Sequence, residues 1–336
     1  MIYRHAGSSG LQLSAVGLGA NRFGEPGGTD GPRSVEVVRS ALDAGINFID
    51  TSNVYATGVS EEHIGAALKG RRHEAVIGTK FGSRRQHGPN LFGGSRLFVM
   101  NALEASLRRL GTDYIDLYMI HRPDPRMPLE ETLRALDDAV ASGKARYIGC
   151  CNFEAWRMVD GLGTSRKLGL QRFATSQFEY SILNRTSERE MVPACQAHGV
   201  GIIPYLPLAA GMLTGKALDA PPPGSRLALE AGTASKWITA ENRSAVAALK
   251  AFASDHGRTV VELAIAWLLA RPQVCSVITG ATSVEQVRQN ANAATWKIGE
   301  GEMRQIEEIL REHPPTPQKG YFSVAGYFEG QTVVVR

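Results

Sequence analysis

The sequence predicts a single α/β domain over residues 1–336, in which eight parallel strands close into a (β/α)8 TIM barrel. Two observations carry this prediction: strand-like apolar runs alternate with amphipathic helical patterns, and several of these runs stop on a polar residue. Alternation of strands and helices favours parallel pairing through right-handed crossovers. Eight such units favour a closed barrel over an open sheet, and 336 residues is an ordinary length for one barrel domain.

The chain opens with a predicted hairpin over residues 3–18, whose turn lies at Gly7-Ser8-Ser9-Gly10. We expect this hairpin to plug one end of the barrel. Eight strand candidates follow, each an apolar run rich in β-branched or aromatic residues: 15–19, 46–50, 75–80, 114–120, 145–150, 173–178, 200–205 and 274–279.

Helices are predicted between the strands, where apolar residues recur at spacings of three and four. Residues 260–269 are apolar nearly all round, which predicts a largely buried helix. The amphipathic stripes are formed by Val35, Val38 and Leu42, by Leu103, Leu107 and Leu110, by Leu129, Leu133, Leu136 and Val140, and by Met303, Ile306 and Leu310.

Two segments break this rhythm. Residues 207–240 follow the seventh strand and contain Pro221-Pro222-Pro223-Gly224, so they are expected to form a long loop over the active face. Residues 314–336 begin with Pro314-Pro315 and have no helical pattern, which predicts an irregular C-terminal tail.

Composition and charge are those of an ordinary globular protein, with 43% hydrophobic and 21% charged residues. The net charge of +4 is spread along the chain, so nucleic-acid and membrane-surface binding receive no support. No signal peptide and no apolar run near the ~20 residues of a membrane span are present, and we expect a cytoplasmic protein. The four cysteines lack C-x-x-C spacing and are expected to be free buried thiols: Cys150, Cys151, Cys195 and Cys275.

Polar residues stand at the ends of several predicted strands. Asp50, Lys80 and Gln177 close such runs, His121 follows one directly, and Tyr55 comes shortly after Asp50. A parallel barrel delivers all its strand ends to one face, where these side chains would converge. No metal site is predicted, because His121 has no nearby partner ligand.

Carbonyl reduction needs this combination of groups. Tyr55 could give a proton to the developing alkoxide, but a free phenol has a pKa near ~10. The Lys80 ammonium would lower the pKa of Tyr55, and Asp50 would pair with Lys80. His121 would donate a hydrogen bond to the carbonyl oxygen. Singly, each residue is better explained as a turn, cap or surface residue, whereas the set at three successive strand ends favours an active site.

The same residues resemble the aldo-keto reductases. Segment 45–55, followed by Gly58-Val59-Ser60-Glu61, is similar to the first signature of that family. Further matches follow in order at 78–80, 116–121, 149–153, 177–178 and 280–290. The resemblance spans about residues 10–295 and implies a reductase in which Tyr55 is the acid of a catalytic tetrad, completed by Asp50, Lys80 and His121.

The cofactor is also implied by this resemblance. The sequence has no dinucleotide fingerprint, since Gly17-Leu18-Gly19 is followed by Arg22 instead of a third glycine, and 211–216 lacks P-loop spacing. The family binds NADPH (NADP+) across the barrel top, with NADH possible. The residues implied are Asn152 and Gln177 at the carboxamide, Tyr205 on the nicotinamide ring, Leu206, Pro207, Leu208, Ala209, Gly211 and Lys216 at the pyrophosphate, Ser225 and Arg226 at the 2′-phosphate, and Gly280, Thr282, Gln286 and Asn290 at the adenosine.

Two departures from the family pattern weaken parts of this assignment. Cys151 stands where many members carry Ser, and Gln286 stands where the best-known members carry a basic residue. A preference for NADPH over NADH therefore depends mainly on Arg226 and Lys216.

The substrate pocket is expected in the loops that follow the strands, and the partner is expected to be a small carbonyl compound. Phe23, Tyr55 and Phe92 indicate an apolar cleft for an aldehyde or ketone carrying a ring or an alkyl group. An anionic substrate such as a sugar phosphate is favoured instead by four basic residues: Arg22, Arg84, Arg85 and Arg122. The sequence leaves both open, and it does not predict the oligomeric state.

Two other functions stay open beside NADPH-dependent carbonyl reduction. Potassium-channel β subunits share the tetrad and act chiefly as cofactor-sensing partners. Segment 211–216 resembles that branch, and its bacterial-type members, more than mammalian aldose reductase. The chain shows no channel-binding extension, however. A sugar dehydrogenase working in the oxidative direction is the third possibility.

Overall fold

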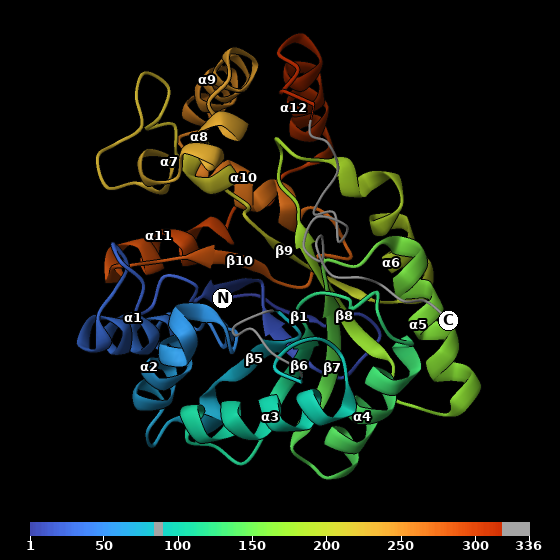
Figure 1. Ribbon diagram of the computed structural model, residues 1–336. Coiled ribbons are helices and arrows are strands. Elements are labelled where there is room, and N and C mark those ends of the chain that lie inside the picture. Colours follow the sequence, from blue (N-terminus) through green and yellow to red (C-terminus); the bar gives the residue numbers. More distant parts are fainter. Residues whose placement is uncertain (84–89, 318–336) are drawn as a thin grey trace.

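The computed structural model describes residues 1–83 and 90–317, and it confirms the barrel (Figure 1). Eight parallel strands form one sheet in the order β10-β3-β4-β5-β6-β7-β8-β9. Their bounds lie close to the predicted ones: β3 (Val16–Gly19), β4 (Phe48–Asp50), β5 (Val76–Phe81), β6 (Ile115–Ile120), β7 (Ala145–Cys151), β8 (Phe173–Glu179), β9 (Gly201–Tyr205) and β10 (Val277–Gly280).

Helices surround the strands, as Figure 1 shows, and the predicted apolar stripes fall on α1, α3, α4 and α12. The apolar segment 260–269 is the buried helix α10, which begins with a capping box formed by Thr259 and Glu262. The helices of the described chain are α1 (Gly31–Asp43), α2 (Val59–Ala67), α3 (Arg96–Leu110), α4 (Leu129–Ala141), α5 (Ala155–Leu168), α6 (Met191–His198), α7 (Arg226–Leu229), α8 (Ala231–Trp237), α9 (Ala240–Asp255), α10 (Val260–Leu269), α11 (Val284–Ala293) and α12 (Glu300–Glu312), with 3-10 turns η1 (Tyr55–Gly58), η2 (Arg72–Glu74), η3 (Thr186–Arg189) and η4 (Ala209–Thr214).

The N-terminal hairpin closes the amino end of the barrel. Its strands are β1 (Tyr3–His5) and β2 (Gln12–Ser14), so the hairpin ends before β3 and is shorter than the predicted 3–18. Ala6 and Leu13 are completely buried and pack with residues of the barrel interior. Gly7 has a φ of +61° and lies so near the start of β9 that a Cβ there would be 2.3 Å from the Gly199 carbonyl oxygen.

The barrel has one weak seam, between β9 and β10. A single parallel bridge joins Ile202 and Val274, with hydrogen bonds of 2.8 Å from Ile202 N to Gln273 O and 2.9 Å from Cys275 N to Ile202 O. By contrast, β10 pairs with β3 from Val277↔Val16 to Gly280↔Gly19. The predicted strand 274–279 therefore begins too early, because its first residues form the bridge and not the ladder.

Segment 207–240 is not the plain loop that its prolines suggested. It contains η4, α7 and α8. The hydroxyl of Ser225 caps α7, and the buried apolar residues Leu227 and Trp237 anchor α7 and α8. Of the predicted tail, 314–317 has no regular structure and 318–336 lies outside the described residues. The four cysteines are buried and free, as predicted. Within the described chain, no helix combines the length and apolar character needed to span a membrane.

Candidate active site

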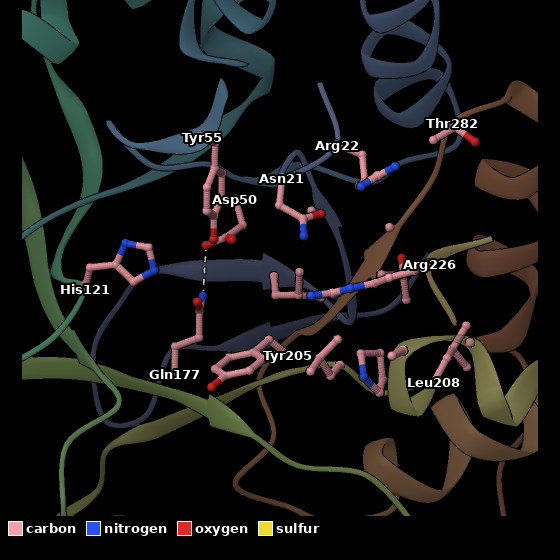
Figure 2. A pocket seen from close by; sticks show the side chains of 18 of the residues that line it. Asn21, Arg22, Asp50, Tyr55, His121, Gln177, Tyr205, Leu208, Arg226 and Thr282 are labelled. Atoms are coloured by element: carbon pink, nitrogen blue, oxygen red, sulfur yellow. Dashed lines mark hydrogen bonds between the residues drawn. The ribbon is translucent and has the colours of Figure 1, made fainter. Parts of the chain in front are cut away.

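The site is a cavity of about 530 Å³ at the carboxyl ends of the barrel strands. Figure 2 shows Asp50, Tyr55, His121 and Gln177 gathered toward one end. Arg22, Arg226 and Thr282 lie toward the other end, and Tyr205 lies between the two groups. The cavity thus joins a polar end with titratable groups to an end that carries guanidinium groups.

Lys80 does not line the cavity itself but contacts two residues that do, Asp50 and Tyr55. Its side chain is completely buried, and its Nζ donates to Asp50 Oδ2 at 2.7 Å and to the Thr51 carbonyl oxygen at 2.8 Å. The same Nζ lies 3.4 Å from the Tyr55 hydroxyl. The other oxygen of Asp50, Oδ1, accepts a hydrogen bond of 2.8 Å from Gln177 Nε2. Strands β4, β5 and β8 and the turn η1 therefore bring together residues up to 127 positions apart.

Burial and neighbouring charges determine which of these groups are protonated at neutral pH. Burial would lower the pKa of Lys80, but Asp50 and the other groups beside it raise that pKa above its usual value. Burial raises the pKa of Tyr55, and Lys80 lowers it by less. Lys80 therefore acts on the Tyr55 pKa in the expected direction, but burial outweighs it: Tyr55 holds its proton and Lys80 is charged at neutral pH.

His121 is held as a neutral imidazole. Burial lowers its pKa well below the usual value, and the positive charges of Lys80 and Arg122 lower it further. Its backbone N–H donates to Phe81 O at 2.7 Å, and its carbonyl accepts from Asn152 Nδ2 at 2.9 Å. The His121 ring meets the Tyr55 ring edge to face, with 5.9 Å between centroids.

Most of the predicted cofactor residues line the cavity. The Tyr205 hydroxyl donates to Asn152 Oδ1 at 2.7 Å, so these two residues form a linked pair beside His121. Those lining the cavity are Asn152, Gln177, Tyr205, Leu206, Pro207, Leu208, Gly211, Arg226, Gly280 and Thr282.

Five predicted cofactor residues do not line it. Ala209 is completely buried, and Lys216 is exposed. The Ser225 hydroxyl caps α7, Gln286 Oε1 accepts from Thr282 N at 2.7 Å, and Asn290 Nδ2 donates to Gly280 O at 3.2 Å. These last three side chains stabilise the backbone around the cavity.

The predicted aromatic lining of the substrate pocket is found only at Tyr55. Phe23 is completely buried in the hydrophobic core, and the Phe92 ring lies 4.4 Å from the Arg126 guanidinium. Neither is among the described residues that line the cavity, whereas Arg22 and Arg122 both are. Arg84 and Arg85 lie outside the described residues.

Several lining residues escaped the sequence analysis. Gly19, Ile278 and Thr279 lie at the carboxyl ends of β3 and β10, where the strand-end rule that found Asp50 applies equally. Gly224 carried no signal, because its position depends on how 207–240 folds. Ser52 was also missed: its Oγ lies 3.0 Å from His121 Nδ1.

The guanidinium end has an unusual backbone. Leu206, Ala209 and Ala210 have φ values of +54°, +47° and +57°, which cost of the order of 1–3 kcal/mol each outside glycine. Gly211, Gly224 and Gly280 line the cavity, and a Cβ at any of them would meet no atom within 4 Å. Strained and side-chain-free backbone of this kind is typical of segments that bind a ligand through main-chain groups.

Comparisons with known proteins agree on one family. The sequence profile of the Aldo/keto reductase family matches residues 15–311. A probable voltage-gated potassium channel subunit beta from Arabidopsis thaliana is 36% identical over 330 residues, which cover 95% of this chain and 99% of that protein. L-glyceraldehyde 3-phosphate reductase from Escherichia coli K12 is 35% identical over 325 residues, 93% of each chain. Aldo-keto reductase AMT2 from Alternaria alternata is 34% identical over 346 residues, 93% of this chain and 92% of that protein.

Proposed function

The chain belongs to the aldo/keto reductase family, and we propose that it reduces an aldehyde or ketone with NADPH, with Tyr55 as the general acid. One observation carries this proposal. The Tyr55 hydroxyl lies 3.4 Å from Lys80 Nζ, which Asp50 holds in turn, and Tyr55 and His121 both border the cavity. Membership of this family and the reductases among the similar proteins support an oxidoreductase activity, and the family generally uses NAD(P)H.

Each residue of the tetrad has a distinct task in this proposal. A bound nicotinamide would supply the hydride. Tyr55 holds its proton at neutral pH and gives it to the oxygen of the reduced carbonyl. Lys80 stabilises the phenolate that remains, and Asp50 keeps Lys80 charged and in place. Neutral His121 donates a hydrogen bond to the carbonyl oxygen and orients the substrate.

The residues present fit NADPH. The side-chain-free strip at Gly211, Gly224 and Gly280 leaves room for a phosphate-bearing chain against the backbone. Arg22 and Arg226 supply positive charge at that end of the cavity, and Tyr205 offers a ring between the two ends. Asn152 and Gln177 already bond to Tyr205, His121 and Asp50, so they would fix the frame around a carboxamide.

The preference for NADPH over NADH depends on fewer residues than the sequence suggested. Lys216 is exposed away from the cavity lining and the Gln286 side chain is bound to Thr282. Arg226 remains as the group to recognise the 2′-phosphate, with Arg22 beside it.

The proposal is tested by Tyr55→Phe, which removes the proton and little volume. We expect kcat to fall about 10²- to 10⁴-fold, because that is the usual contribution of a general acid. The measurement is NADPH oxidation with a panel of aldehydes, ketones and aldose sugars, beside NADPH binding by fluorescence. Binding should be unchanged. A variant that turns over at the wild-type rate would disprove the role of Tyr55.

A second function is favoured by the near-complete match to a relative named as a channel subunit. A cofactor-sensing regulatory subunit would bind NADPH tightly yet show negligible turnover on the whole panel. A sugar dehydrogenase would instead reduce NADP+ in the presence of aldoses faster than it oxidises NADPH with aldehydes. The same panel, run in both directions, separates these functions from carbonyl reduction.

A further inference from the structure

Ser52 is a buried residue beside the catalytic groups. It follows β4 by two positions, its side chain is completely buried, and its Oγ lies 3.0 Å from Nδ1 of His121. In the proposed mechanism Ser52 contacts neither the substrate nor the cofactor. Its one close partner among the tetrad is the imidazole ring.

The direction of this hydrogen bond follows from the other contacts of the hydroxyl. Ser52 Oγ accepts a weak hydrogen bond from Val54 N at 3.4 Å. Its single proton has three acceptors within reach: His121 Nδ1 at 3.0 Å, and Asn53 Oδ1 and the Lys80 carbonyl oxygen at 3.5 Å each. Hydrogen bonds weaken with distance, so donation to Nδ1 is the most favourable use of this proton.

The direction of this hydrogen bond also determines which ring nitrogen of His121 carries the proton. A neutral imidazole carries one N–H and one lone pair. If Nδ1 accepts from Ser52, the ring proton of His121 is on Nε2. Because Ser52 occupies Nδ1, Nε2 is the ring nitrogen available to a ligand in the cavity. The backbone of His121 is hydrogen-bonded on both sides, to Phe81 and Asn152, so the ring turns only about its side-chain torsions.

We propose that Ser52 is a positioning residue that holds His121 in its Nε2–H tautomer, so that the imidazole donates to the carbonyl oxygen beside Tyr55. This inference rests on the proposed reductase function. In the opposite tautomer, Nε2 would present a lone pair to the substrate oxygen, and the site would lose one of its two hydrogen-bond donors.

The tautomer is measured directly by long-range ¹H–¹⁵N NMR of protein labelled at histidine, in which protonated and unprotonated ring nitrogens have well-separated shifts. The variant His121→Asn assigns the signals of His121 by their loss. We expect the Nε2–H form in the wild type, and in Ser52→Ala a shift of population toward Nδ1–H. An Nδ1–H form in the wild type would overturn the proposal without any serine variant.

Kinetics supply the second readout. In Ser52→Ala we expect kcat to fall about 10- to 100-fold, somewhat less than the loss of a whole oxyanion donor, with NADPH binding unchanged. Ser52→Thr keeps the hydroxyl and should restore most of kcat and the Nε2–H tautomer. An unchanged tautomer together with an unchanged kcat in Ser52→Ala would overturn the proposal.

The chain offers a matched control in Ser34. Its buried Oγ also lies 3.0 Å from a histidine Nδ1, that of His63, and neither residue is in the described lining of the cavity. Ser34→Ala should change the His63 signals and leave kcat unchanged. Failure of this proposal is distinct from failure of the proposed function: a wild type that lacks turnover but shows the Ser52-dependent tautomer would refute only the reductase.

Discussion

Single residues in the site are governed by burial as much as by charge. Tyr55 shows this most clearly, since burial raises its pKa by more than the neighbouring Lys80 lowers it. In the proposed reduction Tyr55 would keep its proton until the substrate binds, and Lys80 would serve mainly to stabilise the phenolate that forms afterwards.

The lowered pKa of His121 makes the stability of the fold depend on pH. Its pKa lies well below the usual value because the ring is buried near Lys80 and Arg122. Below about pH 6.5 the unfolded chain therefore binds a proton at this ring that the folded chain does not, and the free energy of unfolding falls as pH falls. Above that pH the ring is neutral in both the folded and the unfolded chain, so His121 no longer makes the free energy of unfolding depend on pH.

We therefore expect urea unfolding of the wild type to lose up to about 1.4 kcal/mol per pH unit more than His121→Asn between roughly pH 6.5 and 5.5. The other histidines contribute equally to both proteins. Parallel pH dependence of the two proteins would contradict a neutral, buried His121.

At this scale the sequence was informative where strand position alone decides. Asp50, Lys80 and His121 were predictable because β4, β5 and β6 must deliver their ends to one face. Phe23 and Phe92 were not, because the direction of a loop side chain depends on packing that no local pattern records. Ser52 was hidden for another reason: a serine near a strand end is most often an ordinary turn residue.

Among the elements, the short helix α7 carries charged groups at the guanidinium end of the cavity. Arg226 is its first residue and pairs with Glu230, just beyond its end, at 3.0 Å. A phosphate that binds Arg226 must compete with this carboxylate. The sequence placed Arg226 near the 2′-phosphate by family resemblance, but Glu230 became visible only once the segment was seen to fold as a helix.

We expect Arg226→Ala to raise the KM for NADPH about 10- to 100-fold, the usual worth of a hydrogen bond to a charged group, and the KM for NADH less than about threefold. Glu230→Gln should have the opposite effect and lower the KM for NADPH a few-fold, because it removes the competing carboxylate. Steady-state kinetics with both cofactors tests this. Equal changes for NADPH and NADH would show that Arg226 does not recognise the 2′-phosphate.

For the whole molecule, the hairpin determines how the amino end of the barrel is sealed. Alternation of strands and helices was enough to predict the barrel, and the turn residues 7–10 were enough to predict the hairpin. The close approach of the hairpin to β9 was not predictable, because it brings together residues almost 200 positions apart. The same holds for the single bridge between β9 and β10.

We expect Gly7→Ala to lower the free energy of unfolding by roughly 2–5 kcal/mol, since it adds both backbone strain and a clash. Gly169 is the matched control: its φ is +68°, but a Cβ there meets nothing within 4 Å. Gly169→Ala should therefore cost only about 1–2 kcal/mol. Equal losses in urea unfolding would mean that the hairpin can move away from β9 at little cost.

The pairing of β3 with β10 also sets the order of events when the chain is synthesised. The first and the last barrel strands are neighbours, so a ribosome that has released the chain only as far as β9 has produced seven of the eight strands with both sheet edges unpaired. Unpaired strand edges invite association with other chains. These edges are therefore open to such contacts until residues 277–280 emerge and join them.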